Sequence, residues 1–292
     1  MISYFEYHII FPMNLSNKSS CPSRLDRLTA GEAFAIMKKK TEEQAVENAL
    51  TRWEMLVGAE GVAHLRRARV AVFGLGGVGG YVVEALARSG VGQLDLIDND
   101  RIAASNLNRQ ILALHSTVGM TKVEAAAARV RDIDPDIHVN TYQTFYLPET
   151  RDQFDFKAYD YVVDCIDTVT GKLDLVMQCR AAGTPIVCAL GTGNKLDPTR
   201  LEVADLSETS VCPLARIMRK ELRRRGVEHV KVVYSKEEPM EPRFQPEKEP
   251  APTEGPEAYG NDRRSVPGSS AFVPPAAGLI LASVVVRDLL AL

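Results

Sequence analysis

The chain has only five cysteines in 292 residues, and no two of them form a Cys-x-x-Cys pair. A structural zinc site built from two such pairs is therefore excluded, and the spacing indicates no disulfide framework. Cys165 and Cys188 lie in apolar, strand-like runs, which favours buried, reduced thiols. The five histidines are scattered without metal-ligand spacing, so we interpret each as structural or exposed.

Long apolar runs and a strong charge of one sign are also missing. Residues 1–13 are aromatic and apolar, but they lack the cationic start of a secretory signal and contain Pro12. The apolar run at 276–286 is too short to span a bilayer. We therefore expect a cytoplasmic protein without a membrane partner. The formal net charge of −3 gives no global attraction to nucleic acid, so any RNA contact must be local.

The most informative stretch that is present runs from Arg69 to Gln110. Four apolar residues lead into the sequence GLGGVG at 74–79, a helix-like stretch follows, and a second apolar run ends at Asp98. This succession of strand, glycine turn, helix, strand and acid is typical of a nucleotide-binding βαβ unit. The glycines let the backbone approach phosphate, and the helix N-terminus presents free N–H groups to it.

The residues after Asp98 indicate which nucleotide chemistry the site performs. Asn106, Arg109 and Lys122 follow it. A hydride-transfer site needs no such Arg and Lys pair, whereas a site that polarises a triphosphate does, because charge builds up on the phosphates as the bond breaks. An NAD(P)-linked oxidoreductase leaves these residues unexplained. A non-catalytic tRNA-binding or scaffold protein is the other alternative, and the intact set of charged residues argues against it.

With these residues the chain resembles the adenylating enzymes related to the ubiquitin-activating family, which include the molybdopterin-synthase and thiamine-pathway adenylyltransferases. The resemblance covers residues 50–205 well and the rest more loosely. It implies ATP and Mg²⁺ as cofactors and a homodimer as the assembly. The matching residues are Gly74, Gly76, Gly77, Gly79, Asp98, Ser105, Asn106, Arg109, Lys122 and Asp167.

The resemblance also implies a role for each position. The glycine turn and Asp98 would hold ATP, with Asp98 at the ribose. Asn106, Arg109 and Lys122 would contact the phosphates, and Asp167 would bind or orient Mg²⁺. We count Arg109, Lys122 and Asp167 as the catalytic residues. A carboxylate substrate needs no general base at neutral pH, so the lack of a catalytic histidine is no objection.

Four further residues complete the candidate site. Asp100 and Ser105 are expected to bind the nucleotide with their neighbours. Arg52 lies in a helix-like stretch upstream, where the family has an arginine that reaches the partner subunit's ATP; a solvated helix arginine is the alternative. Asp164 could replace Asp167 as the magnesium residue, but its alternation along the strand favours a structural role.

Several stretches look most like the tRNA threonylcarbamoyladenosine dehydratase branch, namely 76–90, 164–169, 191–199 and 212–216. That branch is implied to adenylate the carboxylate of a modified adenosine next to the tRNA anticodon. The activated carboxylate then cyclises with loss of AMP, giving a net dehydration. The alternative within the family activates the Gly-Gly tail of a ubiquitin-like sulfur carrier, and the missing zinc cysteines count against it. A cysteine-desulfurase-type partner is a further candidate.

The alternation of elements predicts a Rossmann-like, doubly wound α/β fold with a mainly parallel sheet. Ligands bind beyond the carboxyl ends of such strands, where Asp98 and Asp167 could converge. C-terminal strand and helix additions are expected to follow. The expected strands are 70–74, 93–98, 137–142, 160–165, 186–190 and 199–206, and the expected helices 46–66, 78–89, 120–132, 170–182 and 213–225, before a short strand from Ser269, Pro274-Pro275 and a closing helix.

The domain plan has one main unit. Residues 1–45 fit nothing in the family pattern and are interpreted as a poorly ordered extension or a mis-assigned start. Residues 46–292 form a single adenylating domain. A Pro/Glu-rich loop at 237–262 cannot bury enough apolar surface to order itself, and it is either a lid or a plain insertion.

The helix expected at 213–225 carries six cations, which exceeds ordinary surface density. It is interpreted either as a contact for the tRNA backbone or as a solvated amphipathic face. Cys212 precedes this helix and has either a sulfur- or acyl-transfer role or an incidental one. The six cations are Arg216, Arg219, Lys220, Arg223, Arg224 and Arg225.

Overall fold

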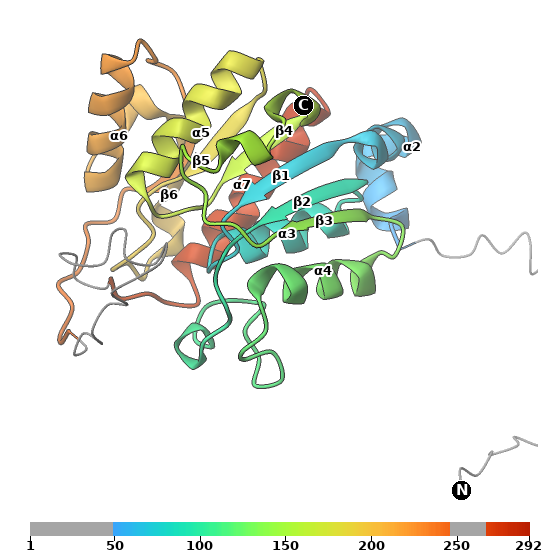
Figure 1. Cartoon of the computed structure of the whole chain (residues 1–292), viewed down its shortest axis with the longest axis horizontal. Coiled ribbons are helices and arrows are strands. Elements are labelled where there is room, and N and C mark those ends of the chain that lie inside the picture. Colours follow the sequence, from blue (N-terminus) through green and yellow to red (C-terminus); the bar gives the residue numbers. More distant parts are fainter. Residues whose placement is uncertain (1–48, 246–266) are drawn as a thin grey trace, which may run out of the picture. The chain divides into compact units, whose positions relative to one another are not determined.

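A seven-stranded sheet forms the centre of the structure, a computed structural model that describes residues 49–245 and 267–292 (Figure 1). The strand order is β3-β2-β1-β4-β5-β7-β6, and all neighbours are parallel except β6 and β7. This order confirms the predicted doubly wound fold, because the chain builds outwards from β1 in both directions. The strands are β1 Arg69–Phe73, β2 Gln93–Ile97, β3 His138–Tyr142, β4 Tyr161–Asp164, β5 Ile186–Ala189, β6 Leu201–Asp205 and β7 Lys231–Ser235.

Two of the expected C-terminal elements differ from the prediction. The sequence did not predict β7, which pairs parallel with β5 and antiparallel with β6. The short strand expected from Ser269 is wrong, because residues 267–270 have no regular structure and α7 (Val273–Leu289) begins soon after. Pro274 and Pro275 lie in the first turn of α7, where a missing N–H costs no helical hydrogen bond.

Helices cover both faces of the sheet, as a doubly wound fold requires (Figure 1). α3, α4 and α7 share an apolar cluster with one face, and α5 and α6 pack on the other. The remaining helices are α2 Thr51–Arg67, α3 Gly79–Arg88, α4 Lys122–Ile133, α5 Val169–Ala182 and α6 Pro213–Arg224, with short 3-10 turns at Ala104–Asn106, Arg151–Gln153, Phe156–Ala158, Pro198–Arg200 and Leu206–Glu208.

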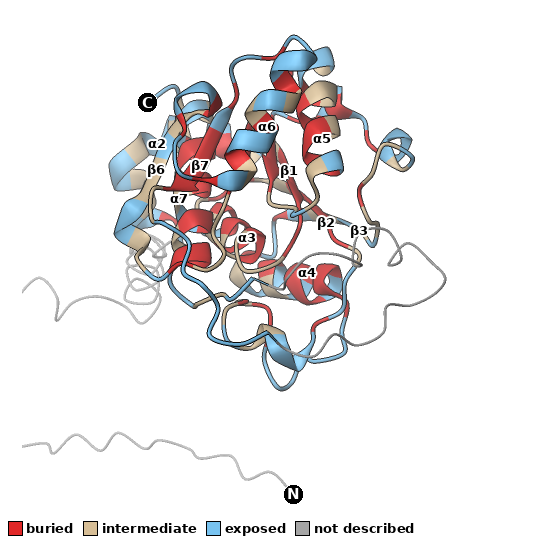
Figure 2. Ribbon diagram, turned by 90° about the vertical axis from the view of Figure 1, so that its left-hand side faces the viewer, coloured by how far each residue is buried: buried red, intermediate tan, exposed pale blue. Residues whose placement is uncertain are grey.

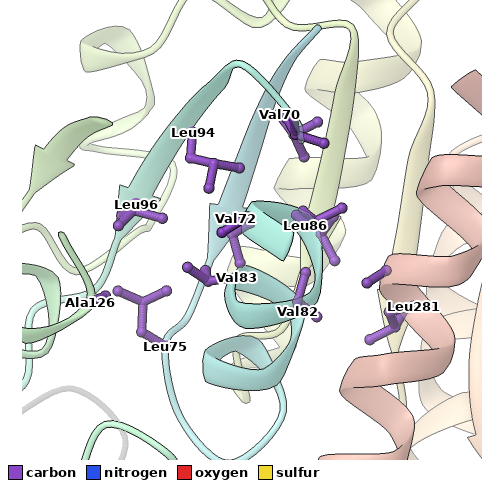
Figure 3. Packing of buried hydrophobic residues seen from close by; sticks show 14 of the residues in the cluster. Val70, Val72, Leu75, Val82, Val83, Leu86, Leu94, Leu96, Ala126 and Leu281 are labelled. Atoms are coloured by element: carbon purple, nitrogen blue, oxygen red, sulfur yellow. The ribbon is translucent and has the colours of Figure 1, made fainter. Parts of the chain in front are cut away.

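The alternation of side chains along β1 supplies both cores. Val70 and Val72 point to the cluster that α3 and α7 complete, whereas Ala71 and Phe73 belong to the aromatic cluster on the opposite face. Figure 3 shows the side chains of α3 packed between those of β1 and β2, with Leu281 of α7 on the other side of α3. Complete burial of these apolar groups holds the ends of β1 and β2 in fixed positions.

The described residues from Leu50 onwards belong to one compact unit. The extension expected at 1–45 lies outside the described residues, as does most of the expected Pro/Glu-rich loop. Residues 237–245 of that loop contain no helix or strand. Within the two described ranges, no helix is long and apolar enough to cross a membrane.

Candidate functional site

The carboxyl end of β1 passes into a tight turn that requires glycine. Gly74 has a φ of 88°, and a Cβ there would lie 2.8 Å from the backbone of Cys165. A Cβ at Gly79 would overlap the carbonyl oxygen of Gly74. The loop after β4 therefore presses directly against the turn. Cys165 is half-buried in this contact rather than buried, whereas Cys188 is buried as predicted.

Free backbone N–H groups line the same turn. Those of Gly76, Gly77 and Val78 have no hydrogen-bond partner within the described residues. α3 starts directly behind them, and no side chain caps its N-terminus. Successive N–H groups at a helix start bind anions, because they carry partial positive charge. The turn can therefore hold the phosphates of a nucleotide.

Asp98, which follows β2, fastens this turn to the sheet. Its Oδ2 accepts a hydrogen bond from the Leu75 N–H at 2.6 Å, and its Oδ1 accepts one from the Asp100 N–H at 2.8 Å. Burial raises the pKa of Asp98 above its ordinary value, although the charge of nearby Lys122 acts in the opposite direction. Carboxylate oxygens have further lone pairs, so Asp98 can also accept a ribose hydroxyl.

Lys122 brings a buried positive charge to the same place. It is the first residue of α4, fixed there by the capping box of Thr121 and Glu124, and it is 5% exposed. Its Nζ lies 2.5 Å from Asp100 Oδ2 and 3.6 Å from Asp98 Oδ1. An ammonium group has three N–H donors, so one is left for a phosphate oxygen.

The loop between β2 and α4 carries Ser105, Asn106 and Arg109. The Asn106 side chain accepts a hydrogen bond from the Ala103 N–H at 3.1 Å and so closes its own 3-10 turn. Arg109 Nη1 donates to the Ser105 carbonyl at 2.9 Å and to Asn108 Oδ1 at 2.8 Å. Partial burial lowers the pKa of Arg109, but a guanidinium stays charged at neutral pH.

Arg109 and the start of α7 border the glycine turn. A Cβ at Gly77 would lie 3.5 Å from Arg109 Cγ and 3.3 Å from Pro274. Asn108 Nδ2 also donates to the Ser269 carbonyl at 3.1 Å, which ties the loop to the segment before α7. The structure thus places the Arg109 stem beside the free N–H groups, and its role in phosphate binding stays a prediction.

The last residue of β4, Asp164, and the acid three residues after it, Asp167, have different surroundings. Asp164 is fully buried and pairs with the fully buried Lys172, whose Nζ lies 3.0 Å from Asp164 Oδ1 and donates to the Ala189 carbonyl at 2.8 Å. This confirms the predicted structural role of Asp164. Asp167 is exposed, and its carboxylate has no partner within the described part of the chain. Among the two acids, Asp167 is the one that is free to meet a cation.

The structure does not bring Arg52 to this site within one chain. Arg52 is exposed in the first turn of α2. Leu50, just before it, would contact a Cβ at Gly90, and the Leu65 carbonyl later in α2 accepts from the Gly92 N–H at 2.9 Å. Both glycines precede β2, so α2 lies at the amino edge of the sheet, opposite the glycine turn.

No group of three or more His, Cys, Asp or Glu side chains that could hold a metal ion exists among the described residues. Mg²⁺ is commonly held by one or two carboxylates together with substrate phosphates, and it keeps several waters. A single exposed carboxylate at Asp167, in the loop that contacts the glycine turn, fits that mode of binding.

The six cations of α6 are not equivalent. Arg219 Nη1 donates to the Thr209 carbonyl and hydroxyl, both at 2.6 Å. Arg224 and Arg225 each lie 2.9 Å from a carboxylate oxygen of Glu221. Figure 2 shows α6 beside α5 with much of its surface exposed. The three cations whose side chains form no hydrogen bond or ion pair within the described chain are Arg216, Lys220 and Arg223.

Cys212 is buried at the start of this helix. The residue is 3% exposed, and its Sγ accepts a weak hydrogen bond from the Ala215 N–H at 3.5 Å. This N-capping contact gives the thiol a structural place. A transfer reaction would require the thiol to become accessible, so the geometry favours the incidental role over the catalytic one.

Two residues near the site were missed in the sequence. Gln110 is 7% exposed, its amide nitrogen would lie 3.9 Å from a Cβ at Gly76, and its Oε1 has no partner within the described chain. Lys172 was missed because the sequence of α5 shows no distinct polar and apolar sides, so nothing marked this lysine as buried. The position of Gln110, directly after Arg109, was the one available signal.

The parallel sheet, the glycine turn and the acid after β2 define a nucleotide-binding α/β protein of the Rossmann-like kind. The chain belongs to the ThiF family, whose model matches residues 49–290. It is 42% identical over 247 residues to the tRNA threonylcarbamoyladenosine dehydratase of Bacillus subtilis, covering 82% of this chain and 94% of that protein.

Solved structures of the Escherichia coli enzyme of the same name are similar throughout the main unit. Its complex with AMP has a TM-score of 0.71 and its complex with ATP one of 0.70. Both are 32% identical and cover 82% of this chain and 92% of that one. These relatives confirm the resemblance to the dehydratase branch.

Proposed function

We propose that this protein is an ATP-dependent, AMP-forming enzyme that cyclises threonylcarbamoyladenosine in tRNA. The carboxylate of the modified base attacks the α-phosphorus of ATP, and pyrophosphate leaves. A nucleophilic atom of the same side chain then attacks the acyl carbon and displaces AMP, so that one water is lost overall. The likeness to the Bacillus subtilis dehydratase over nearly its whole length supports this substrate.

The observation that carries the proposal is the meeting of the glycine turn, Asp98 and Lys122 at one edge of the sheet. The free N–H groups of Gly76, Gly77 and Val78 suit the phosphates of ATP. The third N–H of Lys122 and the guanidinium of Arg109 would neutralise the charge that develops on the α-phosphate. Asp98 would hold the ribose while it keeps the turn in place.

Mg²⁺ is the second cofactor of this proposal, and Asp167 would hold it together with the phosphates. The metal would offset the charge of the departing pyrophosphate. The open position of Asp167, after β4 and next to the turn-contacting Cys165, supports the assignment. Asp164 has a structural role and does not hold the metal in this proposal, since Lys172 already neutralises it.

A homodimer is part of the proposal, because Arg52 can contribute only to a partner's site. A cysteine-desulfurase-type partner stays a candidate without a surface assigned to it. A tRNA substrate makes the cytoplasm the expected compartment.

The test is to incubate the purified protein with ATP, Mg²⁺ and tRNA that bears threonylcarbamoyladenosine, and to weigh the released nucleoside by mass spectrometry. Loss of one water that depends on ATP and is matched by AMP supports the proposal. An unchanged nucleoside from protein that binds ATP would contradict it. The next substrate to test would then be the Gly-Gly tail of a ubiquitin-like protein.

A further inference from the structure

One face of α6 carries three cations whose side chains form no hydrogen bond or ion pair within the described chain. Arg216, Lys220 and Arg223 are spaced four and three residues apart, so they lie on the same side of the helix. All three are exposed, while Ala215, Met218 and Leu222 are buried on the inner side. A surface depression of about 430 Å³ is lined by Arg216, Arg219, Lys220, Arg223 and Arg224.

The stability of the helix does not account for this arrangement. Arg216 lies in the first turn of α6, where the helix dipole disfavours a positive charge. Arg216 and Lys220 are four residues apart, and Lys220 and Arg223 three, so the like charges repel each other. Glu221 forms ion pairs with Arg224 and Arg225, and its charge also attracts Lys220, which leaves Arg216 and Arg223 without a carboxylate nearby in the described chain. A face that costs stability in the free protein is explained by an anionic partner that binds it.

The face starts at the edge of the sheet where the nucleotide site lies. Cys212, which caps α6, is in contact range of Gly191, two residues beyond β5. β5 is two strands from β1 in the sheet order, a distance of about 10 Å at ordinary strand spacing. A macromolecule along α6 therefore has its nearest part close to the glycine turn.

We propose that Arg216, Lys220 and Arg223 bind the sugar–phosphate backbone of the tRNA, and that Arg219, Arg224 and Arg225 do not. This assignment rests on the proposed function. Nucleic acid fits the face better than an acidic protein does, because protein interfaces need an apolar core and α6 exposes one large apolar side chain, Ile217. The tRNA would lie along α6 while its modified base reaches the ATP.

Two double variants with the same change of charge test the proposal. Arg216→Gln with Lys220→Gln removes two unpaired cations, and Arg224→Gln with Arg225→Gln removes the two that Glu221 pairs. We expect the first variant to bind tRNA about tenfold or more weakly at low salt. The slope of log affinity against log salt should fall by about one to two. The second variant should stay within about twofold of the wild type.

An equal loss of tRNA affinity in both double variants would overturn the proposal, since it would reflect net charge alone. Unchanged tRNA affinity in the first variant would overturn it too. The proposal would also be overturned if the first variant bound tRNA normally but no longer bound an acidic protein that the wild type binds. Equal melting temperatures establish that all variants are folded. With modified tRNA, the first variant should raise KM and leave kcat unchanged. A wild type that binds tRNA but never dehydrates it would instead contradict the proposed function.

Discussion

At the scale of single residues, Lys122 and Arg109 differ in what holds them before ATP arrives. Lys122 is buried between two carboxylates, whereas the guanidinium of Arg109 donates hydrogen bonds to residues of its own loop. Loss of either charge should lower turnover by on the order of 10²-fold, as for loss of one preorganised group at a transition state. Lys122→Ala should also lower the melting temperature, because it leaves Asp98 and Asp100 unpaired, and Arg109→Ala should not.

AMP release and thermal unfolding measure the two effects. Arg101→Ala is the matched control, because Arg101 is an exposed arginine nearby that donates only to the Gly119 carbonyl. Near-normal turnover in either site variant would remove that residue from the mechanism. A loss of turnover in the control would show that the whole loop is sensitive to charge.

Asp98 should make stability depend on pH with a particular sign. Burial raises its pKa above 3.8, so the ionised form costs folding free energy at neutral pH. At pH values between the ordinary pKa of an aspartate and the raised pKa in the folded protein, Asp98 is more often protonated in the folded protein than in the unfolded chain. Wild-type stability should therefore rise relative to Asp98→Asn as pH falls from neutral to about 4.

The melting temperatures of the two proteins, measured across this pH range, give the difference directly, because all other acids cancel. A difference that stays flat or reverses would mean that Asp98 is not held in a costly ionised state. The same substitution should weaken ATP binding, so the site would trade stability for function.

At the scale of elements, the loop between β4 and α5 depends on a buried ion pair. Lys172 joins Asp164 to the Ala189 carbonyl and so fixes the loop that contacts Gly74 and carries Asp167. Removal of one partner, as in Lys172→Met, should cost about 3–5 kcal/mol, because it leaves a buried charge uncompensated. Asp164→Leu with Lys172→Met should recover most of that stability.

The double variant separates folding from alignment of the loop. It should melt near the wild-type temperature and yet need more Mg²⁺ for half-maximal AMP formation, since Asp167 is no longer held. Lys195→Met is the control, because Lys195 is a buried lysine bonded to the Ser235 carbonyl away from this loop. An unchanged Mg²⁺ requirement in the folded double variant would show that the pair of Asp164 and Lys172 contributes to packing and not to the position of Asp167.

The predictability of the elements follows from how local their signals are. The apolar runs of β1, β4 and β5 identify them, because strands covered on both faces are apolar over most of their length. β7 has an apolar run of the same kind at residues 232–234, so its local signal was present and was overlooked; only its place between β5 and β6 depends on distant segments. The proline pair at 274–275 suggested a break between two elements, but both residues fit the first turn of α7.

For the candidate site, the sequence predicted the residues but not the contacts that hold them. Asp98, Arg109 and Lys122 lie at fixed spacings from the glycine turn, so the sequence alone selects them as candidates, and their roles at ATP stay predictions. The partners that hold them could not be foreseen, because contacts such as that of Leu75 N–H with Asp98 arise only when two strand ends meet. The same holds for the division of the α6 cations into paired and unpaired ones.

At the scale of the whole molecule, Arg52 should act across a dimer interface or not at all. Arg52→Ala and Lys122→Ala should each be nearly inactive alone. After subunit exchange, mixed dimers contain one site with both wild-type groups, so about a quarter of all sites should become active. Arg88→Ala in place of Arg52→Ala is the control, since Arg88 pairs with Glu84. If the mixture does not regain activity, Arg52 has no role in the partner's site and is a solvated helix arginine.

The position of α7 in the chain has a consequence for how the protein is made. α7 follows every strand in sequence, yet its Leu281 closes the apolar cluster that α3 and β1 begin (Figure 3). During translation the first half of the sheet leaves the ribosome with one side of α3 bare. Contacts between such distant segments slow folding, and exposed apolar surface invites aggregation. We therefore expect the nascent chain to expose this side of α3 until α7 has been synthesised.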